Sequence, residues 1–196
     1  MPQIFTSLND PQLIKLLDEG AVGVLPTDTV YGLVCSARNK VSVERLYGLK
    51  SREKKPGTLI GASVEQIADL GIPKRYLNAV EHFWPGAVSV ETPHDIGYLT
   101  QKTGRQAIRI PAYDELLGLL GQVGPLQTTS ANHPTEPTAR NIDEAKRYFG
   151  DSVDFYVDYG ELGNRPPSTI IRVVDDAIEV IREGAVKIDE WGRIIQ

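Results

Sequence analysis

Three short clusters of hydroxyl and amide side chains adjoin apolar runs in this sequence. Residues 27–29 (TDT) and 128–132 (TTSAN) each follow an apolar segment, and residues 168–169 (ST) precede one. Small polar groups at strand ends are where open α/β sheets usually bind ligands. The same residue types also cap helices and form turns, and for any one cluster that role is the more common. Together the three clusters indicate a polar binding cleft without naming its ligand.

A basic segment at residues 50–57 (KSREKKPG) carries four cations within six positions. An arginine presents a planar fork of donors to phosphate oxygens and a lysine presents a point charge, so the segment suits an anionic ligand such as a polyphosphate. The more common fate of a short charge run is a solvated loop. Pro56 and Gly57 restrict this loop, however, and a charged loop of defined shape is a better anion site than a flexible one.

Arg109 interrupts an apolar run at residues 107–111 (AIRIP). Because side chains alternate along a strand, Arg109 either faces solvent or enters the interior. An inward-facing arginine needs an anionic partner, since an unpaired buried charge is prohibitively costly. A ligand carboxylate would serve, and each hydrogen bond to a charged group contributes roughly 1.5–3 kcal/mol.

The better-known catalytic signatures do not occur in this sequence. It contains no phosphate-binding glycine loop, no Cys-x-x-Cys pair and no histidine spacing typical of metal sites. We expect surface or packing roles for the three scattered histidines. Cys35 is the single cysteine, so no internal disulfide forms, which fits a reducing compartment. No neighbour in sequence would activate its thiol, and we expect it to pack in the core.

The composition is that of an ordinary globular protein. The 196 residues are 41% hydrophobic and 24% charged, and 21 Lys and Arg against 26 Asp and Glu give a net charge of −5. This balance argues against a protein that coats nucleic acid with a uniformly basic surface. No apolar run approaches the about 18 residues of a membrane span, and the N-terminus lacks a signal-peptide pattern. We therefore expect a cytoplasmic protein with one domain, residues 1–196.

Hydrophobic periodicity and capping residues predict alternating helices and strands. We expect helices at 10–19, 41–49, 64–70, 74–83, 113–120 and 143–149, and strands at 21–26, 58–62, 87–91, 106–110, 126–129, 155–158, 169–174 and 178–182. Asp10 or Asn9, Ser63 and Asn141 are the expected N-caps. This order predicts an α/β or α+β sheet of mixed direction.

Six motifs occur in a defined order along the chain. They are PTDTVYGL at 26–33, Lys50-x-Arg52, WPG at 84–86, Arg109-x-Pro111, SAN at 130–132 and PST at 167–169. Each is weak alone, but together they resemble the YrdC/Sua5 family over about residues 13–184. The resemblance implies a twisted, mixed parallel and antiparallel α/β sheet flanked by helices around a deep, positively lined cleft. It also implies the short, single-domain form of the family, with residues 185–196 as a tail that adds a strand or helix, or contacts another chain.

The resemblance implies an enzyme, the nucleotidyltransferase L-threonylcarbamoyladenylate synthase. It would form threonylcarbamoyl-AMP and pyrophosphate from L-threonine, bicarbonate and ATP, with Mg²⁺ accompanying the ATP. The product would pass to the tRNA threonylcarbamoyl transferase complex, which modifies adenosine 37 of tRNA (t6A). Weak binding of tRNA or double-stranded RNA is a further expectation. We do not expect the protein to act at a membrane.

The resemblance also assigns roles to individual residues. Lys50 and Arg52 would be catalytic, and Lys50, Arg52, Ser130, Asn132 and Arg182 would bind ATP; Thr29, Tyr31, Arg109 and Ser168 would bind L-threonine, and no residue is assigned to a metal. Strand alternation favours Thr27 and Thr29 on one side of the chain.

The sequence departs from the family pattern at three places near the expected site. Glu53 stands where the family often has proline, and residues 133–135 (HPT) stand where Ser-Gly is common. Residues 58–61 (TLIG) lack the histidine that some longer members carry near this position. Two other interpretations remain: a non-catalytic module for double-stranded RNA binding or ribosome maturation, and a carbamoyl-adenylate enzyme of the hydrogenase-maturation type. The second type carries zinc-finger-like and transferase regions that this chain lacks.

Overall fold

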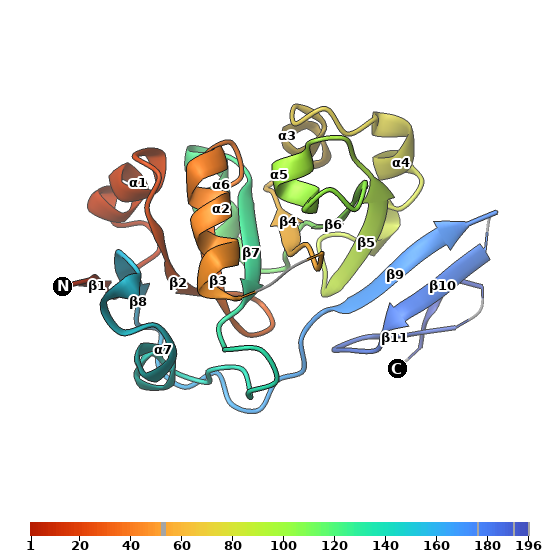
Figure 1. Cartoon of the computed structure of the whole chain (residues 1–196). Coiled ribbons are helices and arrows are strands. Elements are labelled where there is room, and N and C mark those ends of the chain that lie inside the picture. Colours follow the sequence, from red (N-terminus) through yellow and green to blue (C-terminus); the bar gives the residue numbers. More distant parts are fainter. Residues whose placement is uncertain (52–53, 176, 190, 196) are drawn as a thin grey trace.

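A twisted sheet of ten strands organises the computed structural model, which describes residues 1–51, 54–175, 177–189 and 191–195 (Figure 1). The strand order is β1-β8-β2-β3-β7-β4-β6-β5-β9-β10. The strands are β1 (Gln3–Phe5), β2 (Val22–Pro26), β3 (Tyr31–Ser36), β4 (Thr58–Ile60), β5 (Val88–Pro93), β6 (Arg105–Arg109), β7 (Leu126–Ser130), β8 (Phe155–Val157), β9 (Thr169–Val174) and β10 (Ala177–Arg182). The β1/β8, β8/β2, β4/β6 and β5/β9 pairs are parallel and the others antiparallel, which confirms the predicted mixed sheet.

Helices cover both faces of this sheet. They are α1 (Pro11–Asp18), α2 (Lys40–Leu49), α3 (Val64–Ala68), α4 (Lys74–Asn78), α5 (Gly97–Thr100), α6 (Asp114–Val123) and α7 (Ile142–Phe149), with 3-10 turns η1 (Glu81–Phe83) and η2 (Gly150–Ser152). The predicted caps at Asp10, Ser63 and Asn141 are confirmed, because each side chain accepts a hydrogen bond from a backbone N–H in the first turn.

The strands bury side chains alternately on two apolar layers. Val24 and Leu33 belong to the layer with α2, α3 and α7, whereas Leu25 and Val34 belong to the layer with α1 and α6. Cys35 lies fully buried in the first layer, where desolvation raises the pKa of its thiol, so its predicted packing role is confirmed. The central strands are therefore covered on both faces, and the polar residues at their ends have fixed positions.

The structure differs from the predicted elements in one divided helix and three short additional elements. The helix expected over 74–83 divides into α4 and η1, because Leu77 packs in the first layer while Val80 and Phe83 pack in a separate cluster beneath β5 and β9. The short elements β1, β3 and α5 were not predicted, since three to six residues containing glycine or polar positions carry little periodicity.

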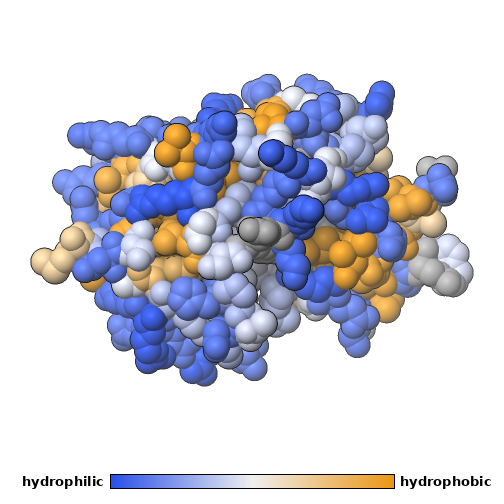
Figure 2. All heavy atoms as spheres, viewed as in Figure 1, coloured by the Kyte–Doolittle hydropathy of each residue, from blue (hydrophilic) through white to orange (hydrophobic). Residues whose placement is uncertain are grey.

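The C-terminal part of the chain forms a hairpin and a small second sheet. β9 and β10 pair antiparallel at one end of the large sheet, and β11 (Lys187–Ile188) pairs with β12 (Ile194–Ile195), so the tail adds strands rather than a helix. Figure 2 shows apolar side chains gathered over this end of the molecule, where Val180 and Ile181 are 38% and 43% exposed.

Among the helices formed by the described residues, none has the length and apolar character needed to cross a membrane.

Gly23 provides a test of the packing between β2 and β8. An added Cβ there would lie 2.5 Å from three atoms of the Phe155 ring. Overpacking of a core typically costs about 1–3 kcal/mol, and we expect Gly23→Ala to lower the free energy of unfolding by that amount in urea denaturation. Gly48 is the matched control: it lies exposed in α2, and an added Cβ meets nothing within 4 Å. Gly48→Ala should raise the free energy of unfolding by about 0.5–1 kcal/mol. Equal effects at the two glycines would contradict the packing argument.

Candidate active site

The segment between β2 and β3 forms a tight turn that is held by the Thr27 hydroxyl. Thr27 Oγ1 donates to the Val30 carbonyl oxygen at 2.6 Å and accepts from the backbone N–H groups of Thr29 and Val30, each at 3.2 Å. The turn closes the antiparallel pair in which Pro26 lies opposite Tyr31. One of the hydroxyls in the first polar cluster is therefore a structural element of the turn itself.

Strand pairing brings the three polar clusters of the sequence to one pocket. Gly32 of β3 lies opposite Ser130 of β7, and Thr58 of β4 lies opposite Thr128 of β7, so the turn, the end of β7 and the start of β4 meet. The pocket, here called the central pocket, has a volume of about 130 Å³. Its polar lining comes from Thr27, Thr29, Thr58, Arg109, Thr128, Thr129, Ser130, Ser168 and Arg182. Thr27 and Thr29 both line it, although the turn places them there and not the alternation of an extended strand.

Arg109 points into the interior and is 3% exposed. Its Nη1 forms an ion pair and a hydrogen bond with Asp28 Oδ1, and Asp28 Oδ2 accepts a hydrogen bond from the Ala112 N–H at 3.1 Å. The anionic partner that an inward-facing Arg109 requires is thus present within the protein, in Asp28. Arg109 Nε is buried and has no hydrogen-bond partner among the described residues.

Lys50, Ser130 and Asn132 form one hydrogen-bonded network. The Lys50 ammonium donates to the Ser130 carbonyl oxygen and to Asn132 Oδ1, both at 2.8 Å, and also to the Asn132 carbonyl oxygen. Ser130 Oγ donates to the same Asn132 Oδ1 at 2.7 Å. These three side chains line a second cavity of about 350 Å³, the lysine cavity, which shares Ser130 with the central pocket. Arg52 lies outside the described residues.

Arg182 and Ser168 close the central pocket from the β9–β10 hairpin. Arg182 Nη2 donates to the Ser168 carbonyl oxygen at 2.6 Å, and Ser168 Oγ lies 2.9 Å from Ser89 Oγ. Gly184 allows this close approach, because an added Cβ would overlap the Pro167 carbonyl oxygen. The hairpin and the 167–168 segment therefore reach the pocket as one unit.

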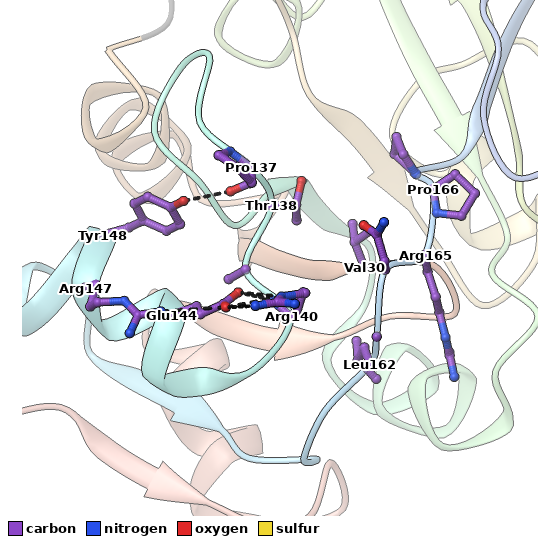
Figure 3. A pocket seen from close by; sticks show the side chains of 14 residues that line it. Val30, Pro137, Thr138, Arg140, Glu144, Arg147, Tyr148, Leu162, Arg165 and Pro166 are labelled. Carbon is purple, nitrogen blue, oxygen red and sulfur yellow. Dashed lines mark hydrogen bonds and ion pairs between the residues drawn. The ribbon is translucent and has the colours of Figure 1, made fainter.

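A third and larger cavity adjoins the central pocket and shares Val30 and Pro167 with it (Figure 3). This outer cavity has a volume of about 870 Å³ and lies between residues 137–148 and 162–167. Figure 3 shows Arg140 bonded to Glu144 on one side of it and Arg165 on the other; Tyr148 donates to the Pro137 carbonyl oxygen at 2.8 Å. This cavity was not predicted from the sequence, although the proline- and glycine-containing stretch 160–167 was a signal for an ordered loop.

Cations dominate the lining of the three cavities. They are Lys50, Lys55, Arg109, Arg140, Arg147, Arg165 and Arg182, and the one carboxylate among the described lining residues is Glu144. A protein of net charge −5 thus concentrates positive charge where its strand ends converge. Such a cleft attracts anionic ligands, because low-dielectric walls focus the field of the charges that line them.

Tyr31 does not join the other residues expected to bind threonine. Its side chain is fully buried in the first apolar layer, and its hydroxyl donates to the Gly160 carbonyl oxygen at 2.9 Å and accepts from the Tyr159 N–H at 3.0 Å. Desolvation raises the pKa of this phenol. Tyr31 therefore anchors the chain that leads to the outer cavity, which corrects its expected place in the pocket.

Three residues that the sequence analysis did not assign contribute to the site. Thr129 Oγ1 is buried at the central pocket without a hydrogen-bond partner among the described residues. Gly57 lies against β7, where an added Cβ would overlap the Thr128 carbonyl oxygen. Asp28 holds Arg109. Thr129 belongs to the TTSAN cluster, Gly57 to the basic segment and Asp28 to the TDT cluster. Only the pairing of distant strands, however, shows which of these residues reach the pocket.

The described residues contain no group of three or more histidine, cysteine, aspartate or glutamate side chains arranged to hold a metal ion.

Comparison with known proteins identifies relatives of this chain. A threonylcarbamoyl-AMP synthase of Idiomarina loihiensis is 34% identical over 169 residues, covering 82% of this chain and 90% of the relative. P. abyssi Sua5 complexed with L-threonine superposes with a TM-score of 0.82 at 24% identity, over 95% of this chain and 58% of that longer one. E. coli YciO superposes with a TM-score of 0.83 at 23% identity, over 97% of this chain and 100% of YciO.

The Sua5/YciO/YrdC family model, described as "Telomere recombination", matches residues 15–184. This span contains the turn at 27–30, the lysine network and the Arg109 strand, together with the hairpin residues Ser168 and Arg182. The chain belongs to the Sua5/YciO/YrdC family.

Proposed function

We propose that this protein is a threonylcarbamoyl-AMP synthase, which joins L-threonine, bicarbonate and ATP into L-threonylcarbamoyladenylate and releases pyrophosphate. The observation that carries this proposal is the convergence of the Lys50 network and the Arg109 pocket at Ser130, in one cationic cleft. Curated relatives of the chain are named for this activity, and a protein of the same fold has been seen with L-threonine.

The central pocket suits the amino acid. It is small, its polar lining consists mainly of hydroxyl groups, and Arg109, whose buried Nε has no hydrogen-bond partner among the described residues, lines it as a donor for the carboxylate. Thr29, Thr129 and Ser168 offer hydroxyls to the amine, the carbamate and the side-chain oxygen of threonine. A site that pairs a substrate hydroxyl strongly rejects analogues without one, because its own buried polar groups would remain unpaired.

The lysine cavity and the outer cavity suit ATP. Lys50, with Ser130 and Asn132, would provide charge and donors for phosphate oxygens. Arg182 approaches from the hairpin, and we propose that Arg52 acts on the same phosphates. The outer cavity has room for a nucleoside. Mg²⁺ would enter with ATP, coordinated mainly by phosphate oxygens and water.

The reaction needs positioning and charge stabilisation rather than a covalent enzyme intermediate. The threonine amine and bicarbonate form an N-carboxylate with loss of water, one carboxylate oxygen attacks the α-phosphorus of ATP, and pyrophosphate leaves. Cations at the junction of the cavities, Lys50 and Arg182, would stabilise the charge that develops on the phosphate oxygens. We propose that the product passes in the cytoplasm to the transferase that modifies adenosine 37 of tRNA.

Removal of the Lys50 ammonium tests the nucleotide assignment. We expect Lys50→Ala to reduce threonine- and bicarbonate-dependent release of pyrophosphate from ATP on the order of 100-fold or more, because one preorganised charge-stabilising donor is lost. Its thermal unfolding midpoint reports whether the fold is retained. The control is Lys15→Ala, since Lys15 forms an exposed i,i+4 pair with Glu19 and lines none of the three cavities. Near-wild-type turnover by Lys50→Ala would refute the assignment of Lys50 to the nucleotide site. If the wild-type protein shows no turnover but binds RNA, the non-catalytic module is favoured instead.

Replacement of the substrate tests the hydroxyl-lined pocket. L-2-Aminobutyrate has the carbon skeleton of threonine without its hydroxyl group. We expect its kcat/KM for pyrophosphate release to be lower than that of L-threonine by orders of magnitude, since the pocket hydroxyls would lose their partner. Similar kcat/KM values for the two amino acids would contradict recognition of the hydroxyl group.

A further inference from the structure

We propose that Asp28 is a positioning residue for the amino-acid substrate, which it serves by holding one edge of the Arg109 guanidinium so that the other edge faces the central pocket. The inference rests on the proposed function, in which Arg109 binds the substrate carboxylate. It assigns a role to the aspartate of the turn, which lines a different cavity from the substrate pocket.

The ion pair between these residues crosses the wall that separates two cavities. Arg109 lines the central pocket, whereas Asp28 lines a cavity of about 310 Å³ on the other side, beside Ala112 and Tyr113. The side chains of Asp28 and Arg109 are only 7% and 4% exposed. A buried pair of this kind is strongly destabilised when one partner is removed, because the remaining charge stays uncompensated.

The Asp28 carboxylate has little freedom to move. Both of its oxygens are engaged, one by Arg109 Nη1 and the other by the Ala112 N–H. The backbone on either side of it is fixed by the Thr27 hydroxyl, which bonds to three backbone groups of the turn. The partner strand is equally fixed, since β6 lies between β4 and β5 and the Gly61 N–H donates to the Arg109 carbonyl oxygen at 3.2 Å.

The guanidinium geometry leaves a defined edge for a ligand. A guanidinium presents its donors in a rigid planar fork, and two adjacent N–H groups match a carboxylate bidentately. Asp28 occupies Nη1, and the buried Nε of Arg109 has no hydrogen-bond partner among the described residues. Nε and the adjacent Nη2 therefore form the edge that Asp28 does not use, and we assign this edge to the substrate carboxylate. Asp28 also neutralises Arg109 before substrate arrives, so the cation remains buried in the free protein.

This arrangement predicts an effect of Asp28 that is specific to the substrate carboxylate. We expect Asp28→Asn to raise the KM for L-threonine on the order of 10- to 100-fold, as is typical when the partner that orients a ligand-binding group is removed. The KM for ATP should not change. The inhibition constant of L-threoninol, which has the threonine side chain and amine but no carboxylate, should also stay at its wild-type value. Asp28→Glu retains the charge and should restore part of the threonine affinity.

A double-variant comparison separates positioning from general damage to the pocket. If Asp28 acts through Arg109, Asp28→Asn should have no further effect on the threonine KM in an Arg109→Gln background. Equal losses of threonine and threoninol binding in Asp28→Asn, or additive effects in the double variant, would overturn the inference. If Asp28→Asn does not fold, two other variants make the same comparison. These are Asp28→Glu and the double variant Asp28→Asn/Arg109→Gln, which buries no charge at this pair, and the threonine KM of each is compared with that of Arg109→Gln.

Asp154 provides a matched control. Its carboxylate also bonds an arginine and a backbone N–H, namely Arg45 at 2.5 Å and Val22 at 2.8 Å, but it lies at the β8 end of the sheet. Asp154→Asn should lower the thermal unfolding midpoint and leave both KM values unchanged.

The proposed function and the proposed role of Asp28 would be contradicted by different results. Wild-type protein without threonine-dependent turnover contradicts the proposed function, and an Arg109→Gln variant with the wild-type threonine KM contradicts the carboxylate assignment. Normal behaviour of Asp28→Asn beside an impaired Arg109→Gln overturns the role of Asp28 alone.

Discussion

Arg109 carries a full positive charge into the interior of the sheet, and much of the site depends on how that charge is compensated. Asp28 provides the compensation from a turn whose shape is fixed by the Thr27 hydroxyl. Because the pair is almost fully buried, neither side chain can turn to solvent without a large cost in free energy. The turn, held by Thr27, and the ion pair together place Thr27, Thr29 and Arg109 around the central pocket.

A second cation, Lys50, is held in a different way. Its ammonium donates hydrogen bonds to two carbonyl oxygens and to the Asn132 side chain. A hydrogen bond to an ionised acceptor such as a phosphate oxygen is stronger than one to a neutral oxygen, which fits the proposed role of Lys50 in binding ATP.

Local sequence patterns predicted most of the secondary structure. The capping side chains of Asp10, Ser63 and Asn141 act within one helical turn, so they can be read without tertiary information. The basic segment likewise indicated an anion site, and the TTSAN cluster indicated a polar cleft without naming its ligand. The helix expected over 74–83 was wrong because its two halves pack in different clusters, a property that local periodicity does not contain.

Residue types and local patterns are enough to establish which side chains are available for chemistry, where most strands and helices lie, and that an inward-facing Arg109 needs an anion. The fold is needed to show that this anion is Asp28, 81 positions earlier in the chain, and that Tyr31 is an anchor in the core. It also decided that residues 137–148 and 162–167 enclose a large cavity. The physical reason is that such contacts depend on the register between distant strands, and one residue of shift would turn each side chain to the opposite face of the sheet.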